Sequence, residues 1–235
     1  FVIKGAKKWA ELLVPVLSDI KISWNGATKE THEKIMRGSK WENVTENLKT
    51  FLNVRDNYFN NTGKTCSVTL QLTFLETNLP EIYDLTKMAI ELGLDRIKGH
   101  HLWAHFEEIK HLSMRRSPEA IKRWNSEVEK IYELKDKMLL PNGKKIKLEN
   151  FTILNIDATE DLAPGGACPF LGKEAWVNPE GKFSPCCAPD ELRNQLGNFG
   201  NVNETKLEEI WQGTMYKNLQ KNYLNYNLCK TCNMK

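Results

Sequence analysis

The sequence predicts an α/β protein in which strand–helix units form the C-terminal part of a partial (β/α) barrel and precede a small α+β domain. Over residues 1–150, short apolar runs typical of strands alternate with longer amphipathic helices. Consecutive units of this kind are joined by right-handed crossovers, so their strands pair in parallel. Beyond residue 150 the pattern changes to a hairpin and a single helix, and five of the six cysteines lie there. We therefore expect two domains, residues 1–150 and 151–235.

The first strand–helix unit follows from an apolar run and a capping residue. The run "SDIKISWNG" at 18–26 predicts a buried strand that ends in a turn. Thr28 is the expected N-cap of a helix through "KETHEKIM". A second helix is expected from about Lys40 to Tyr58.

Two more units follow the same rules. The stretch "CSVTLQLTFLE" at 66–76 is rich in β-branched and aromatic residues and predicts a strand, with Cys66 in the core. The next helix should have Pro80 in its first turn and Gly93 just past its end. The run "DRIKGHHLW" predicts the third strand, and Ser117 should cap the long helix that follows. Three units are too few to close an eight-stranded barrel, so we expect a fragment of a longer chain.

The remaining segments are less regular. The polar run "LLPNGKKIKLEN" at 139–150 is expected to be a turn-rich connection, and "FTILNID" at 151–157 a strand. The run "AWVNPEGKFSPC" at 175–186 predicts a hairpin that turns at "NPEG". One amphipathic helix is expected over 204–223.

Composition and charge argue against several classes of protein. The net charge is only +3, and basic residues alternate with acidic ones, whereas nucleic-acid binders concentrate their Lys and Arg. Apolar runs such as "LLVPVL" are too short to span a bilayer, and the first residues lack the apolar core of a signal peptide. We therefore expect a cytoplasmic protein with no membrane or nucleic-acid partner. In that reducing compartment, clustered cysteines bind metal or do redox chemistry more often than they form disulfides.

Four cysteines have the spacing of a metal site. Cys168 precedes the predicted hairpin, Cys186 ends it, and Cys229 and Cys232 form a C-x-x-C turn. Four thiolates around one point suit either tetrahedral zinc or an iron–sulfur cluster. Cys187 follows Cys186 directly, and because adjacent side chains of a strand point to opposite faces, the two should not share one metal. The residues alone leave open which of the two is the ligand.

These motifs carry a family resemblance. The C-x12-G-x4-C arrangement from Cys168 through Gly181 to Cys186, the "GNFGNV" before a helix, and the closing C-x-x-C resemble the auxiliary-cluster domain of radical S-adenosylmethionine (radical SAM) enzymes. That domain is called SPASM, or twitch in its shorter form. Upstream, "ISWNGATKETHEKIMRG" resembles the fourth strand and helix of the radical SAM barrel, and "LQLTFLETNLPEI" resembles the fifth strand.

The resemblance implies one auxiliary [4Fe–4S] cluster, bound by Cys168, Cys186, Cys229 and Cys232. Cys186 is preferred over Cys187 because its spacing from Gly181 matches the family pattern. Nearby lysines are expected to moderate the negative charge of such a cluster: Lys173, Lys182 and Lys230.

The resemblance also implies an S-adenosylmethionine site. Ser23, at the end of the strand, matches a position that often contacts this cofactor, and Gln71 is a weaker candidate. Where many relatives have Arg after "KI", this chain has Met36, with Arg37 next to it. The C-x3-C-x2-C loop that binds the second, SAM-cleaving [4Fe–4S] cluster is not in the sequence, and we expect it upstream in the intact protein.

The implied activity is that of a radical SAM enzyme when intact. It would generate a 5′-deoxyadenosyl radical and abstract hydrogen from a small-molecule or peptide substrate, with electrons from a donor such as flavodoxin or ferredoxin. Two alternatives remain from the residues themselves: a structural zinc module on an α/β scaffold, and an iron–sulfur electron carrier. His100 and His101, at the end of the third strand, are candidates for substrate contact or proton transfer.

Overall fold

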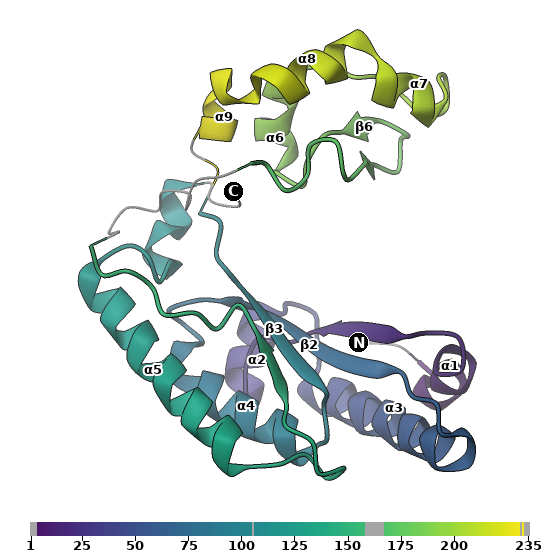
Figure 1. Ribbon diagram of the computed structural model, residues 1–235, viewed down its shortest axis with the longest axis vertical. Coiled ribbons are helices and arrows are strands. Elements are labelled where there is room, and N and C mark those ends of the chain that lie inside the picture. The colour runs from purple at the N-terminus through teal and green to yellow at the C-terminus, as the bar shows by residue number, and fades with distance from the viewer. Residues whose placement is uncertain (1–3, 105, 158–166, 231, 233–235) are drawn as a thin grey trace. The chain divides into compact units, whose positions relative to one another are not determined.

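The computed structural model of the chain describes residues 4–104, 106–157, 167–230 and 232. It consists of two compact units, Phe1–Glu160 and Asp161–Lys235, each of which is described by itself (Figure 1). Among the described residues, no helix combines the length and the apolarity that crossing a bilayer requires.

A parallel sheet forms the framework of the first unit. Its strands lie in the order β1-β2-β3-β4, and each neighbouring pair is parallel: β1 (Asp19–Ser23), β2 (Ser67–Phe74), β3 (Arg96–His101) and β4 (Lys147–Glu149). The helices of this unit are α1 (Ala6–Leu13), α2 (Lys29–Ile35), α3 (Trp41–Thr62), α4 (Ile82–Glu91) and α5 (Pro118–Lys137), with short 3₁₀ turns at Leu79–Glu81 and Glu107–Leu112. The expected α/β fold with a parallel sheet is confirmed.

One face of this sheet lies against helices. Side chains at alternate strand positions are almost fully buried: Ile22, Val68, Leu70, Leu72, Phe74 and Ile97. They share a single core with Phe51 of α3, Leu85 of α4 and Trp124 of α5, and Figure 1 shows these helices along one side of the strands. Alternation along a strand sends every second side chain to the opposite face, which is therefore available for a site.

The helix boundaries follow the capping residues in the sequence. The Thr28 hydroxyl accepts a hydrogen bond from Thr31 N (3.3 Å) and begins α2. The Ser117 hydroxyl accepts one from Ala120 N (3.2 Å) and begins α5. Gly93 follows the end of α4 with φ 76°, which glycine adopts without strain. These predicted boundaries are confirmed.

Two predictions around residue 150 were wrong. The segment expected to be a connection contains β4, because Ile146 is buried and the register Lys147↔Arg96 adds a fourth strand to the sheet. Residues 151–155 form no strand. Instead, the Asn125 side chain on α5 exchanges hydrogen bonds with the backbone of Leu154 (2.8 and 2.9 Å). This segment packs on the first unit, so the division falls after Glu160 rather than near 150.

The second unit is a short hairpin with helices around it. Strands β5 (Trp176–Val177) and β6 (Phe183–Ser184) pair antiparallel, as predicted. The helical segments are α6 (Asp190–Arg193), α7 (Leu207–Gln212), α8 (Thr214–Asn222) and α9 (Asn227–Lys230), with 3₁₀ turns at Asn194–Leu196 and Tyr223–Asn225. The single helix expected over 204–223 is in fact two, because the extended backbone of Gly213 (ψ 148°) ends α7.

Aromatic rings fill the core of this unit. Phe183 of β6 and Tyr216 of α8 are each 1% exposed, with ring centroids 5.2 Å apart. Gly181 in the hairpin turn has φ 83°, and its N–H bonds to Asn178 O (2.9 Å). A Cβ at Gly181 would lie 2.4 Å from Asn201 Oδ1, so the turn needs glycine for both conformation and space.

The packing of β3 against β2 gives a test of the first core. A Cβ at Gly99 would lie 1.8 Å from Cζ of Phe74. We expect Gly99→Ala to lower the free energy of unfolding by about 1–3 kcal/mol, the usual range for an overpacked core, as measured by urea denaturation. Adding Phe74→Leu should return part of the loss, since the smaller side chain makes room. Losses that simply add in the double variant would contradict this account.

Candidate functional site

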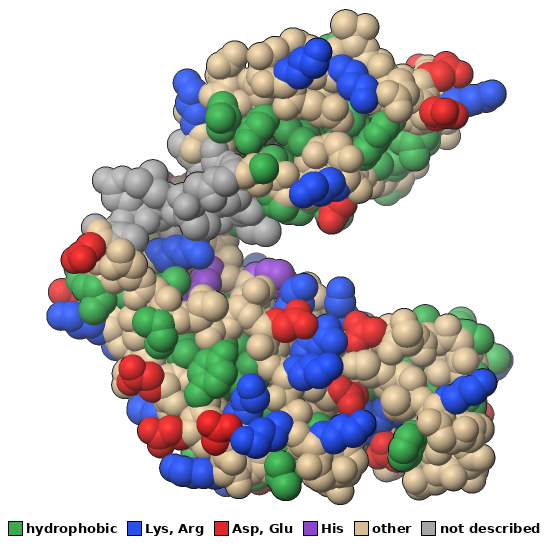
Figure 2. All heavy atoms as spheres, in the orientation of Figure 1, with side chains coloured by type: hydrophobic (Ala, Val, Ile, Leu, Met, Phe, Trp, Pro, Cys, Tyr) green, Lys and Arg blue, Asp and Glu red, His purple; other side chains and the backbone are tan. Residues whose placement is uncertain are grey.

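The face of the sheet opposite the helices is polar. It carries these side chains from four strands: Lys21 and Ser23, Thr69, Gln71 and Thr73, Arg96, Lys98 and His100, and Glu149. Most of them are half-buried or exposed, in contrast to their apolar neighbours along each strand. Figure 2 shows Lys and Arg side chains interspersed with Asp and Glu over the strands of this unit.

Ser23 and Gln71, the predicted cofactor residues, are direct neighbours on this face. The register pairs Ser23 with Gln71, Gln71 with Lys98, and Lys98 with Glu149. One row of polar side chains therefore crosses all four strands of the described sheet. Glu149 accepts from Arg96 (2.8 Å) and forms a longer ion pair with Lys98 (3.5 Å).

The two histidines at the end of β3 lie on opposite faces. His100 is on the polar face, where burial, and then the charges of Lys98 and Lys21, lower the pKa of its imidazole. Glu149 opposes this shift. The imidazole of His100 is therefore neutral near pH 7 and available to accept or donate a hydrogen bond.

His101 belongs to the apolar face instead. Its ring centroid lies 5.1 Å from that of Phe74 and 4.8 Å from that of Trp124. Burial lowers its pKa to about 3, and neither ring nitrogen has a hydrogen-bond partner among the described residues. His101 therefore packs against aromatic side chains of the core, and of the two candidates only His100 lies on the face with Ser23 and Gln71. Period-two alternation from Lys98 could have separated them.

Two asparagines join the loops at the ends of β1 and β2. Asn25 Oδ1 accepts from Thr73 N (2.9 Å), and Asn78 Nδ2 donates to the carbonyls of Asn25 (3.2 Å) and Thr73 (2.9 Å). Both asparagines are buried. They hold the loop after Ser23 against the loop after β2, a role that no motif in the sequence indicates.

The Glu81 carboxylate holds the start of α2. It accepts hydrogen bonds from Ala27 N (2.8 Å), from Thr28 N and Oγ1 (3.0 and 2.8 Å) and from Thr31 Oγ1 (2.5 Å). Burial raises the pKa of this carboxyl, but the hydrogen bonds outweigh burial and leave it lowered. An ionised Glu81 therefore fixes the turn that follows Ser23. No local sequence signal links residues so far apart.

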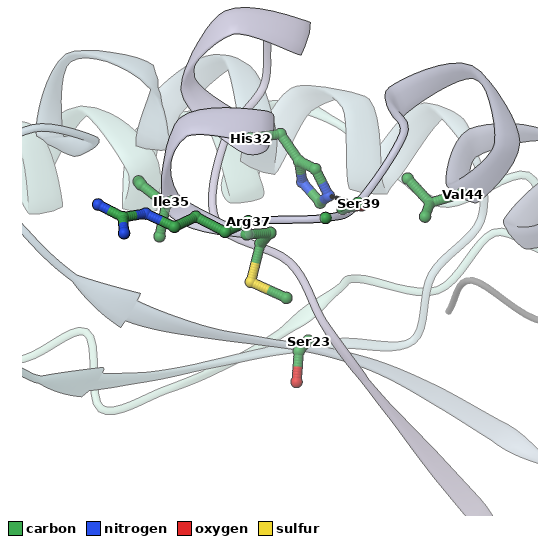
Figure 3. A pocket seen from close by; sticks show the side chains of 8 residues that line it. Ser23, His32, Ile35, Arg37, Ser39 and Val44 are labelled. Atoms are coloured by element: carbon green, nitrogen blue, oxygen red, sulfur yellow. Dashed lines mark hydrogen bonds between the residues drawn. The ribbon is translucent and has the colours of Figure 1, made fainter.

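A pocket of about 450 Å³ opens beside β1, at the loop between α2 and α3. Among its lining residues, the buried His32 imidazole lies 3.1 Å from Ser39 Oγ and packs against Trp24 (4.7 Å between ring centroids). Ser23 also lines this pocket, and in Figure 3 its hydroxyl points away from the His32 and Arg37 side chains. Met36, which takes the place of an expected Arg, accepts a hydrogen bond from Asn25 through its sulfur (3.0 Å).

The second candidate site is the group of cysteines in the C-terminal unit. Cys186 is 8% exposed, and burial is the main reason that the pKa of its thiol is raised. Cys187, Cys168 and Cys232 raise it further, so these thiols lie within electrostatic reach of Cys186. Cys229 lies on α9, three positions before Cys232.

The cysteines are gathered without forming a closed coordination shell. All six are free thiols, and within the described ranges no group of three or more His, Cys, Asp or Glu side chains is arranged to hold a metal ion. The chemistry of the donors nevertheless fits an iron–sulfur cluster, because thiolates are its usual ligands. Four ionised thiols repel one another until a cation neutralises them, so binding and closure of such a site are coupled.

Cys186 and Cys187 differ in their surroundings. Cys186 is buried beside the other thiols, whereas Cys187 is exposed. Partial burial is the main reason that the pKa of the Cys187 thiol is raised; Glu174 and Cys168 raise it further, and Arg193 lowers it.

The Arg193 guanidinium lies at this group of cysteines. Its Nη1 donates to the Cys186 carbonyl (3.4 Å), its Nη2 pairs with Asp190, and its Nε is buried with no partner among the described residues. The lysines expected to moderate charge have other positions: Lys182 donates to Asn194 Oδ1 (2.7 Å), and Lys173 and Lys230 are exposed. No motif in the sequence indicates this position of Arg193.

Comparison with known proteins defines the class of the chain. Residues 168–233 match the SPASM family, an iron–sulfur cluster-binding domain. No curated protein matches the sequence. The solved structures that match include Streptococcus suis SuiB bound to the precursor peptide SuiA, at 15% identity and a TM-score of 0.56, over 92% of this chain and 47% of that one. They also include anSMEcpe with bound AdoMet and Cp18Cys peptide, at 14% identity and a TM-score of 0.58, over 99% of this chain and 62% of that one.

The chain is therefore a parallel α/β unit followed by a region that matches an iron–sulfur cluster-binding family. More particularly, residues 168–233 match the SPASM family and the chain shares the fold of SuiB and anSMEcpe, as the expected resemblance predicts. It spans about half to three-fifths of the length of the structures that it matches.

The position of His101 predicts a pH dependence of stability. Because its folded pKa is about 3 and its usual value is 6.5, only the unfolded chain takes up a proton there between these values. Stability should therefore fall as pH drops through this range, by at most about 1.4 kcal/mol per pH unit from this group. His101→Phe should make the slope of unfolding free energy against pH, measured by urea denaturation between pH 6.5 and 4.5, shallower. His111→Phe, at an exposed site, is the control. A slope in His101→Phe equal to that of the wild type would show that His101 does not cause the pH dependence.

Proposed function

We propose that the chain is part of a radical SAM enzyme whose SPASM domain holds one auxiliary [4Fe–4S] cluster on Cys168, Cys186, Cys229 and Cys232. The observation that carries the proposal is the match of residues 168–233 to an iron–sulfur cluster-binding family. Cys187, Cys168 and Cys232 all raise the pKa of the Cys186 thiol, which supports this group of cysteines as the site. Cys186 is chosen over Cys187 because it is the buried member of the pair.

The polar face of the sheet is the proposed site for S-adenosylmethionine and substrate. When bound, S-adenosylmethionine and the cluster that cleaves it supply a 5′-deoxyadenosyl radical for hydrogen abstraction; we assign that cluster to another part of the intact protein. Ser23 and Gln71, paired in register, would hydrogen-bond the cofactor. Neutral His100 and cationic Lys98 lie on the same face, where they would orient polar groups of the substrate.

The asparagine and glutamate contacts at the ends of β1 and β2 would keep this face in position. Asn78 ties the two loops together, and Glu81 fixes the turn after Ser23. Preorganised side chains of this kind lower the cost of placing a reactive group against its substrate.

A peptide is the substrate class we propose. SuiB bound to its precursor peptide and anSMEcpe bound to AdoMet and peptide share this fold. A reducing electron donor such as flavodoxin or ferredoxin, and a cytoplasmic location, complete the proposal.

Serine variants of the cysteines test the ligand set. After anaerobic reconstitution with iron and sulfide, Cys168→Ser, Cys186→Ser, Cys229→Ser and Cys232→Ser should each lose most of the visible cluster absorption, because a thiolate ligand is missing. Cys187→Ser is the matched control and should retain it. Loss in Cys187→Ser with retention in Cys186→Ser would instead make Cys187 the ligand.

Binding of the cofactor tests the polar row. In the intact protein, Ser23→Ala and Gln71→Ala should each raise the Kd for S-adenosylmethionine about two- to tenfold, the range for one lost hydrogen bond, as measured by isothermal titration calorimetry. Lys49→Ala, at an exposed position of α3, should leave the Kd unchanged. Kd values equal to that of the wild type in both Ser23→Ala and Gln71→Ala would contradict the proposed site.

A further inference from the structure

We propose that Arg193 is the positive charge that sets the reduction potential of the cluster in the C-terminal unit, a proposal that rests on the function proposed above. Of the lysines expected for this role, Lys182 is bonded to Asn194, and Lys173 and Lys230 are exposed. Arg193 is better placed for it. Its Nη1 donates to the Cys186 carbonyl, its side chain is mostly buried, and its Nε is buried with no partner among the described residues.

The local fold brings Arg193 back to the cysteines. Helix α6 begins directly after the Cys186-Cys187-Ala188-Pro189 segment, and Arg193 N bonds to Pro189 O (2.9 Å). This single helical turn lets Nη1 of Arg193 reach the Cys186 carbonyl (3.4 Å). A short turn therefore fixes a cation beside the backbone carbonyl of a proposed ligand.

The guanidinium keeps unused hydrogen-bonding capacity at this place. Arg193 is mostly buried, with 17% of its side chain exposed. Its Nη2 pairs with the exposed Asp190, while its Nε is buried with no partner among the described residues. A buried N–H without an acceptor costs free energy, so its presence needs a partner. Cluster sulfur and thiolate sulfur are acceptors of the right kind, and such hydrogen bonds are known to tune cluster potentials.

The positive charge of Arg193 and a hydrogen bond from its Nε would both favour the reduced state of the cluster. Reduction adds one electron to a group that is already negative, so a nearby cation stabilises the reduced state more than the oxidised state. Glu174 beside Cys187 and Asp190 beside Arg193 act against this effect. Removal of Arg193 should therefore make the cluster harder to reduce, and removal of Asp190 should make it easier.

The test is a redox titration of the reconstituted chain, followed by electron paramagnetic resonance of the reduced cluster. In Arg193→Gln, the ratio of reduced to oxidised cluster at a fixed potential should fall about fivefold or more, since fivefold is the effect of one unit charge about 4 Å away even at the dielectric constant of bulk water. Arg193→Lys should show a smaller fall, since it keeps the charge and loses the planar fork. Asp190→Asn should raise the ratio.

Lys182→Gln is the matched control, because it removes one positive charge from the same unit at a side chain bonded to Asn194. It should leave the ratio close to that of the wild type. Equal ratios in Arg193→Gln and wild type, or equal shifts in Arg193→Gln and Lys182→Gln, would overturn the role of Arg193 while leaving the cluster in place. Failure of the wild-type chain to assemble any cluster would instead overturn the proposed function.

Discussion

The alternation of side chains along four parallel strands is the constraint on which the first unit depends. Ile22, Leu70 and Ile97 pack with the helices in one core, and this fixes the register of every strand. Because the period of a strand is two, the same register places Ser23, Gln71, Lys98 and Glu149 in one row on the other face. A slip of one residue would bury the polar row and expose the core. The apolar packing therefore positions the proposed site without touching it.

Long-range hydrogen bonds then fix the loops that follow the strands, which the pairing of the sheet does not hold. Asn78 connects the loops after β1 and β2, and Glu81 holds the first turn of α2 through four donors. The C-terminal unit has no extended sheet among its described residues. A small aromatic core around Phe183 and Tyr216 holds its loops and short helices together. Its cysteines are close enough to influence one another electrostatically. A bound cluster would add the cross-link that this core lacks.

Local signals predicted the strands β1–β3, the capping residues Thr28 and Ser117, and the hairpin with Gly181, because each depends on neighbours in sequence. They missed β4, whose three residues are specified by pairing with β3. The break at Gly213 was missed because the amphipathic pattern continues across it. At the sites, cysteine spacing pointed to the right domain, and the register brought Ser23 beside Gln71. Arg193, Asn78 and Glu81 could not be predicted, since their partners are set by tertiary contacts.

The central claim is that the C-terminal unit binds an iron–sulfur cluster through four thiolates. Its most direct test is the content of iron, acid-labile sulfide and zinc in the chain isolated under anaerobic conditions. About four irons and four sulfides per chain are expected, the content of one [4Fe–4S] cluster. One zinc per chain with no sulfide, as in a structural thiolate site, would contradict it.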